Sequence, residues 1–285
     1  MKGLFVAVML AAILVFGCIS QPPPATPTPT PAATNTPAAT ATPEWTQTPE
    51  PTAAAAGCPP VITACCNITS PGEYTLGGNL SSEGLDACVT ITSGGSGSVL
   101  DCDGHSMIGT DRGYGIFLDR ASRVTVRDCA LARFESGIYL YSPDSTANNI
   151  TGNSAARNYD GIKMQESSYN SITNNNADAN IYGIFASNSR GNAIIGNGAN
   201  SNGAGIYLDG SDNCTVANNT AYANRNAGIK LSSSQGNIFA NNSLVQNIFR
   251  DNFLCGSGST EEGSNVDGGG NTCGEIGACH WLTCH

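Results

Sequence analysis

One short phrase recurs along this chain at an almost constant interval: a glycine and an isoleucine, followed two places on by an apolar residue. The glycines that open it are Gly115, Gly137, Gly161, Gly183, Gly205 and Gly228, separated by 22, 24, 22, 22 and 23 residues. A repeat of this length is typical of a solenoid, in which each unit is one turn of a coil that cannot bury its apolar side alone. The sequence therefore predicts stacked turns, with function to be sought on their outer surface.

The repeating units are expected to be β-strands. They are rich in Gly, Asn, Ser and β-branched residues and poor in helix formers. Apolar residues alternate within each phrase, as at Ile116 and Leu118, which is the period of a half-buried strand. A left-handed coil would need a repeat of about 18 residues with a six-residue submotif. We therefore predict an all-β, right-handed parallel β-helix solenoid with turns of about 22–24 residues and disulfide-rich end caps.

Asparagines recur at about the same interval as the glycines and are expected to form two columns. An asparagine amide both donates and accepts, so each can bond the residue above and the residue below. Asparagine also tolerates the left-handed backbone that a corner requires. We interpret both columns as structural ladders. The first contains Asn153, Asn175, Asn197, Asn219 and Asn241, and the second contains Asn158, Asn180, Asn202, Asn224 and Asn247.

The N-terminus predicts export. A lysine at position 2 precedes an apolar run from Leu4 to Phe16, which is typical of a secretory signal in residues 1–18. The run ends in Val-Phe-Gly-Cys18, which resembles a lipobox and predicts lipid on Cys18, although Phe16 is larger than usual there. An uncleaved anchor is the alternative, and it is weakened by the shortness of the run. Residues 19–57 are mostly Pro, Thr and Ala and predict a disordered stalk. We expect an exported, membrane-anchored cell-surface protein.

Cysteine is abundant, with 12 residues in a chain expected to be exported, so disulfides are predicted. Solenoid turns are expected over residues 58–254, and a cysteine-rich cap over 255–285. In the cap, His280 and His285 leave a zinc or copper site as an alternative, but no CxxC pair supports it. Cys214 is the candidate odd thiol. Disulfide candidates are Cys65, Cys66, Cys88, Cys102, Cys129, Cys255, Cys273, Cys279 and Cys284.

Charge limits the partners. The formal net charge is -10 at pH 7, which argues against nucleic acid. Asn-x-Ser/Thr sequons allow glycosylation wherever the host has the machinery. They lie at Asn67, Asn79, Asn149, Asn213, Asn218 and Asn241.

Two further motifs carry a family resemblance. The stretch from Leu100 to Gly109 reads Leu-Asp-Cys-Asp-Gly-His-Ser-Met-Ile-Gly, and Val124 to Cys129 reads Val-Thr-Val-Arg-Asp-Cys. With the Gly-Ile phrases, they make the chain resemble the NosD-like parallel β-helix repeat proteins, within the broader group of carbohydrate-binding and sugar-hydrolase β-helix domains. The resemblance covers about residues 65–255 and implies the fold. It leaves activity open, because such repeats occur in polysaccharide lyases, epimerases, adhesins and a copper-delivery factor.

An enzyme would need carboxylates grouped on one face, since glycoside cleavage uses two of them. A lyase would need a base and a cation, often calcium, and no cofactor is expected otherwise. The alternative is that these charges form exposed salt bridges and a turn. Copper delivery, a second alternative, is disfavoured because a soft copper site needs clustered Met and thiolate ligands. The catalytic candidates are Asp101, Asp103, His105, Asp119, Arg127 and Asp128.

A binding surface is the favoured hypothesis. The residue between Ile and the next apolar position should point outward, forming a column of Phe117, Tyr139, Lys163, Phe185, Tyr207 and Lys230. Aromatic faces can stack on sugar rings, and Gln165 and Asp209 could accept hydroxyl protons. The alternative is that these side chains only pack on one another. We predict a surface-anchored protein that binds a polysaccharide or glycoprotein of the envelope or shapes the envelope itself. A polysaccharide lyase, epimerase or glycoside hydrolase is the alternative.

Overall fold

The structure is a computed structural model that describes residues 57–247, 251–255 and 264–273, with only the backbone of 251–255. The signal segment with Cys18, nearly all of the predicted stalk, and Cys279, His280, Cys284 and His285 lie outside the described residues. The predictions for them stay predictions. Among the residues that are described, no helix is long and apolar enough to cross a membrane.

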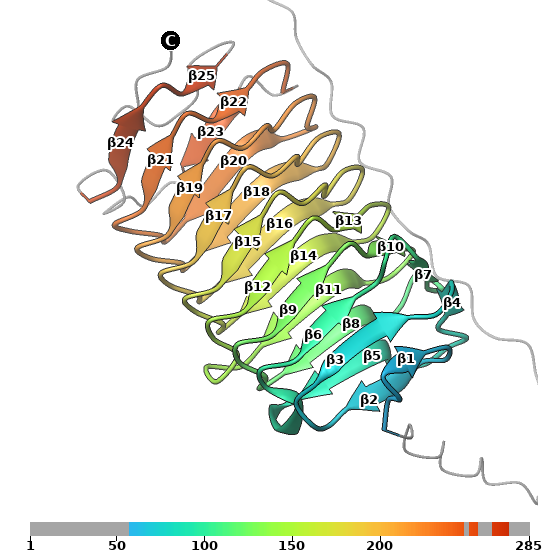
Figure 1. The fold of residues 1–285 in the computed structure, drawn as a ribbon. Helices are drawn as coiled ribbons and strands as arrows, with labels where there is room; N and C mark the ends of the chain where they lie inside the picture. Colours follow the sequence, from blue (N-terminus) through green and yellow to red (C-terminus); the bar gives the residue numbers. More distant parts are fainter. Residues whose placement is uncertain (1–56, 248–250, 256–263, 274–285) are drawn as a thin grey trace, which may run out of the picture. The chain divides into compact units, whose positions relative to one another are not determined.

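The chain folds as an all-β, right-handed parallel β-solenoid of about eight turns, which confirms the predicted fold (Figure 1). Two long sheets and a shorter third side form the walls of the coil. Sheet A contains β2 (Cys66–Ile68), β5 (Ala87–Thr92), β8 (Tyr114–Asp119), β11 (Ser136–Tyr141), β14 (Asp160–Gln165), β16 (Tyr182–Ser187), β18 (Ala204–Asp209), β20 (Ala227–Ser232) and β23 (Asp251–Cys255).

Sheet B follows sheet A in each turn, and the third side, sheet C, closes the turn. Sheet B contains β1 (Val61–Ile62), β3 (Glu73–Leu76), β6 (Val99–Asp101), β9 (Thr125–Arg127), β12 (Asn149–Thr151), β15 (Ser171–Thr173), β17 (Ala193–Ile195), β19 (Thr215–Ala217), β21 (Ile238–Ala240) and β24 (Val266–Gly269). Sheet C contains β4 (Leu80–Ser81), β7 (Ser106–Ile108), β10 (Ala130–Ala132) and β13 (Ser154–Ala155), continues as single bridges, and ends with the pair β22 (Ser243–Leu244) and β25 (Thr272–Cys273).

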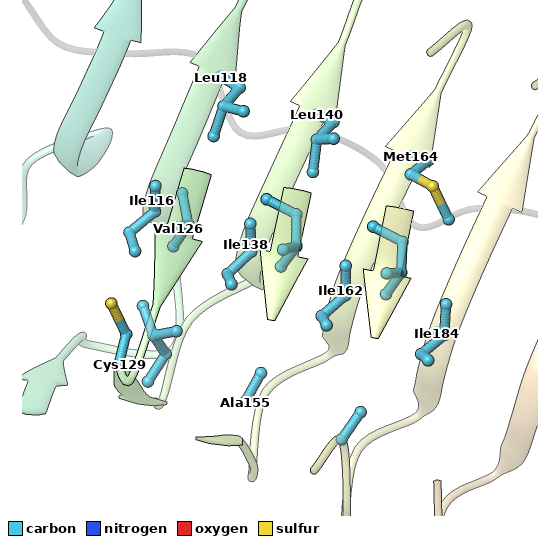
Figure 2. Packing of buried hydrophobic residues seen from close by; sticks show 14 of the residues in the cluster. Ile116, Leu118, Val126, Cys129, Ile138, Leu140, Ala155, Ile162, Met164 and Ile184 are labelled. Carbon is cyan, nitrogen blue, oxygen red and sulfur yellow. The ribbon is translucent and has the colours of Figure 1, made fainter. Parts of the chain in front are cut away.

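Stacked apolar columns form the core. Figure 2 shows Ile116, Ile138, Ile162 and Ile184 in one row, and each is fully buried. The glycine before each isoleucine is required by the next turn, since a Cβ on Gly161 would lie 2.5 Å from the carbonyl oxygen of Gly183. The recurring phrase therefore reports a close approach of backbones as well as an apolar face.

The asparagine columns are hydrogen-bonded ladders. Asn175 Nδ2 donates to Asn197 Oδ1 at 3.1 Å and to the Ile150 carbonyl at 2.9 Å, while Asn175 Oδ1 accepts from the backbone and the side chain of Asn153. In the second column Asn180 Oδ1 accepts from the Asn158 backbone at 2.7 Å.

One ladder residue differs from the prediction. Asn219 donates to Asn242, not to Asn241, and Asn241 is an exposed corner residue with a positive φ of 53°. The cause is one extra residue in that turn, which pairs Val216 with Phe239 and moves the apolar inward position from Ile238 to Phe239. A third ladder was not predicted. Its members are Asn148, Asn170, Asn192, Asn237 and Asn265, and the buried free thiol Cys214 occupies the place of an asparagine, with its backbone donating to Asn237.

Three disulfides close the early turns, namely Cys58–Cys66, Cys65–Cys88 and Cys102–Cys129. Cys58 had not been a candidate. Cys102 and Cys129 do not occupy equivalent positions on their two successive turns. The strand register pairs Asp101 with Arg127, so Asp128 is the residue level with Cys102, and the Asp103-Gly104 turn follows Cys102. Cys273 is also disulfide-bonded, whereas Cys214 is the free cysteine among the side chains that are described.

Candidate functional site

The outer face of sheet A carries the predicted column. The strand register places its six members side by side on successive strands: Phe117, Tyr139, Lys163, Phe185, Tyr207 and Lys230. Because the residues on either side of each member point into the core, the column points outward. Each of these side chains nevertheless packs against at least one neighbour in the column.

The column consists of two matching blocks, each made of a phenylalanine, a tyrosine and a lysine. Phe117 and Tyr139 stack with ring centroids 5.3 Å apart, and Lys163 Nζ lies 4.9 Å from the Tyr139 centroid. In the second block Phe185 and Tyr207 stack at 5.0 Å, and Lys230 Nζ lies 4.2 Å from the Tyr207 centroid. The two faces of each tyrosine are therefore covered, one by a ring and the other by a cation.

A second tyrosine supports each block from the side. Tyr114 lies 4.8 Å from Tyr139, and Tyr182 lies 5.5 Å from Tyr207, measured between ring centroids. Tyr139 is left only 7% exposed. It therefore cannot present a ring face to a sugar, contrary to what the outward column alone suggests.

A buried acid distinguishes the blocks. Asp160 Oδ2 lies 3.8 Å from Lys163 Nζ, whereas Ala227 holds the equivalent position beside Lys230. Asp160 is 2% exposed, and among the described residues its Oδ1 has no well-formed hydrogen bond. Burial raises the pKa of Asp160 to about 7, with Glu135 adding to the increase and Lys163 opposing it. The first block therefore contains a carboxyl group that titrates near neutrality.

The first block ends in a hollow. The neighbours of Phe117 on the side away from Tyr139 are Thr90 and then Asn67, which are too small to cover the ring. The space of about 640 Å³ in front of them is lined by Phe117, Tyr114 and these small residues. We call it the Phe117 hollow. It is where the aromatic column borders an open space, with the half-buried ring of Phe117 at its wall.

Charged groups converge on the same hollow. Asp86, Arg112 and Glu135 line it together with Tyr114. Burial first, and then the negative charges of Glu135 and Asp86, raise the pKa of Tyr114, so its hydroxyl remains a proton donor. Two carboxylates, a guanidinium, a phenol and a half-buried ring form a polar surface around one aromatic face. Sequence reasoning did not bring these three charged residues together. Asp86 lies in a turn that lacks the Gly-Ile phrase and could not be aligned, whereas Arg112 and Glu135 lie directly before the phrases at Gly115 and Gly137.

The predicted catalytic group is divided between corners. Asp101, Arg127 and Asp128 lie where sheet B ends, and Asp103 and His105 lie in the following turn, whereas Asp119 ends a strand of sheet A. Asp101 forms an ion pair with Arg127 at 2.8 Å. The backbone N–H of Asp103 and then Arg127 lower the pKa of Asp101.

Gln165 and Asp209, the two residues predicted to accept hydrogen bonds from sugar hydroxyls, lie on different strands, β14 and β18. Gln165 Oε1 accepts a hydrogen bond from the Tyr139 hydroxyl at 3.0 Å, and Asp209 ends β18 in register with Ser187 and Ser232. Gln165 therefore belongs to the first block, and Asp209 lies at the border of the second.

The chain matches the protein family described as periplasmic copper-binding protein (NosD) over residues 81–252, more than half of its length. It belongs to the NosD family. No curated protein sequence matches it. Kinship with an exported family and three disulfides indicate that this NosD-family chain is exported.

Solved structures with the same fold act on polysaccharides. Pectate lyase Pel9A is 16% identical with a TM-score of 0.56, covering 80% of this chain and 66% of its own. The Azotobacter vinelandii mannuronan C-5 epimerase AlgE6 A-module is 14% identical with a TM-score of 0.54, covering 73% and 62%. A double mutant of the periplasmic alginate epimerase AlgG is 22% identical with a TM-score of 0.53, covering 64% of this chain and 51% of its own. The chain spans about half the length of AlgG, and these likenesses show the fold alone.

The family description refers to copper binding, which requires a group of side chains that could form a copper site. In the part of the chain that the structure describes, no group of three His, Cys, Asp or Glu side chains could hold a metal ion. Met107 and Met164 are buried in the apolar core, His105 is the single described histidine, and Cys214 is isolated in an asparagine ladder. The described residues of this NosD-family chain therefore do not fit a copper site.

Proposed function

We propose that the protein binds a polysaccharide or the glycan of a glycoprotein at the Phe117 hollow. The observation that carries the proposal is the half-buried ring of Phe117 in the wall of the hollow, with Tyr114, Asp86, Arg112 and Glu135 around it. Sugar sites combine an aromatic surface with a few hydrogen-bonding groups that orient the ring. The structural neighbours support the ligand class, since they are named for alginate, mannuronan and pectate.

Phe117→Ala tests the site, and Phe185→Ala is the matched control. Both rings stack on a tyrosine in the same column, but only Phe117 lines the hollow. Affinity for a bound oligosaccharide should fall about tenfold or more for Phe117→Ala and less than about twofold for Phe185→Ala, measured by calorimetric titration. Equal losses in the two variants would contradict binding at the hollow.

A polysaccharide lyase, epimerase or glycoside hydrolase is the second candidate function. Asp86 and Glu135 place two carboxylates on the hollow, and Arg112 places a cation there. Proton abstraction beside a uronate carboxyl needs a base and a positive group of this kind. Incubation with alginate and polygalacturonate should then yield cleaved or epimerised product, and Glu135→Gln should abolish it. Binding without turnover would rule out the enzyme function and support only the binding function.

Attachment to the cell surface belongs to the same proposal. The predicted lipid at Cys18 and the 19–57 stalk would hold the hollow at a distance from the membrane. Cys18→Ser should then release the protein into detergent-free fractions. Retention in the membrane would favour the uncleaved anchor.

A further inference from the structure

A second hollow lies at the corner between sheets A and B, away from the outer face of sheet A. Its volume is about 420 Å³, and its lining includes Pro143, Glu166, Tyr169, Arg190 and Gly210. We call it the Tyr169 hollow. It spans four successive turns, because Pro143, Tyr169, Arg190 and Gly210 each belong to a different one.

The hollow has a simple structural origin. Tyr141 pairs with Gln165 and Asn149 pairs with Ser171, so the corner at 141–149 contains two more residues than the corner at 165–171. The extra residues include Pro143, which forms one wall. On the opposite side Gly210 contributes no side chain. An insertion and a glycine therefore leave open space above Tyr169.

Tyr169 has a backbone conformation that is unfavourable for its side chain. Its φ is +59°, in the left-handed region where bulky residues are outliers. Tyr169 is nevertheless a tyrosine and is 58% exposed. Smaller residues serve this corner in the neighbouring turns, where Ala147, Gly191, Asn213 and Gly236 all have positive φ. The fold therefore does not require a tyrosine here, and strained residues of this kind concentrate at functional sites.

The ring is held in place from below. A Cβ on Gly191 would lie 2.6 Å from two carbons of the Tyr169 ring, so only glycine allows the ring to rest there. The Arg190 guanidinium carbon lies 5.8 Å from the ring centroid. The aromatic side chain is therefore supported by the solenoid instead of extending freely into solvent.

The charges of the hollow are unpaired. Within the described residues neither the Glu166 side chain nor the Arg190 side chain forms a salt bridge or a hydrogen bond, and Asp212 already accepts from the Gln235 backbone at 2.7 Å. An exposed aromatic ring, together with a carboxylate and a guanidinium that have no hydrogen-bond partner among the described residues, can bind a ligand with an apolar face and several hydroxyl groups. Opposite charges side by side disfavour a polyanion, and the open, polar lining disfavours a lipid.

We propose that the Tyr169 hollow is a second saccharide site, in which a sugar ring stacks on Tyr169 while Glu166 and Arg190 bind its hydroxyl groups. The proposal does not depend on binding at the Phe117 hollow. A polysaccharide that reached both sites would be held with avidity, because the second contact becomes intramolecular.

Tyr169→Asn is the decisive variant, since asparagine suits a left-handed corner and removes the ring. The protein, labelled isotopically on tyrosine, is titrated with cellohexaose, mannohexaose, chitohexaose and a mannuronate hexamer. The Tyr169 resonance should shift saturably with at least one of these. Tyr169→Asn should weaken that binding about tenfold or more while leaving the melting temperature unchanged or raised. Tyr222→Asn, which removes another exposed tyrosine, should leave binding unchanged.

Three outcomes would overturn the proposal. Resonances of Tyr114 could move while that of Tyr169 stays still, which would leave the Phe117 hollow as a site by itself. A fall in melting temperature of several degrees for Tyr169→Asn would identify Tyr169 as a packing residue. If no tyrosine resonance responds to any saccharide, both this proposal and the proposed function fail.

Discussion

The asparagine ladders and the outer column of sheet A repeat with the same turns, but they differ in how strictly they keep one residue type. Each ladder keeps one residue type through successive turns, with Cys214 as the exception in one of them. The outer column changes from ring to cation and back. A buried amide must find a partner above and below, whereas an outward side chain needs none. Variation on the outer face is therefore permitted by the fold, and function can use it.

The largest effect is expected where a ladder is broken. Asn175→Leu removes the acceptor of the Asn153 backbone N–H and the donor to the Ile150 carbonyl. The free energy of unfolding should fall by about 3 kcal/mol or more, because buried polar groups are left unpaired. Urea denaturation measures it.

The neighbouring residue is the control for that variant. Asn174 is exposed at a corner with a φ of +55°, a conformation that glycine accepts. Asn174→Gly should change stability by less than about 0.5 kcal/mol. Similar losses for both variants would show that the ladder contributes little beyond an ordinary corner.

A smaller effect should separate the two blocks of the outer column. Lys163→Met leaves the buried Asp160 carboxylate without its cation and should cost about 2 kcal/mol near pH 8. Among the described side chains Lys230 has only its contact with the Tyr207 ring, so Lys230→Met should cost less than about 1 kcal/mol. Equal costs would mean that Asp160 does not distinguish the blocks.

The cost of Lys163→Met should depend on pH. Burial raises the pKa of Asp160 from its ordinary 3.8 to about 7, so the folded protein holds a proton in that range that the unfolded chain releases. The contribution of Asp160 to stability therefore decreases as pH rises through this window. Without Lys163 the pKa rises further, which extends the loss to higher pH. Unfolding measured at about pH 5 should show little difference between the variant and the parent, and at about pH 8 a large one.

The smallest effect is expected at the corner that the sequence suggested for catalysis. Asp128 is exposed with a φ of +55°, and Asn174 and Asn218 hold the same corner in later turns. Asp128→Asn should change stability by less than about 0.5 kcal/mol. If Asp128 only forms the corner, the variant should also keep any polysaccharide-cleaving activity of the parent. A selective loss of activity would return Asp128 to the catalytic candidates.

The sequence alone determined what repeats. The interval between glycines specified the solenoid and its turn length, and the alternation around Ile116 and Leu118 specified which side chains point outward. The members of the outer column were predicted as neighbours, and they are. These features are local and periodic, so one turn informs the next.

Only the tertiary structure decided what interrupts the period. One added residue moved the ladder from Asn241 to Asn242, and two added residues opened the Tyr169 hollow. Around Phe117, Asn67, Asp86 and Thr90 come from turns that lack the recurring phrase, and they meet Arg112 and Glu135, which precede the phrases at Gly115 and Gly137. An insertion at a corner shifts every later position relative to the turn beneath it, and side chains meet according to that stacking. Which polar groups share a hollow therefore depends on the register between turns, which the repeat interval does not contain.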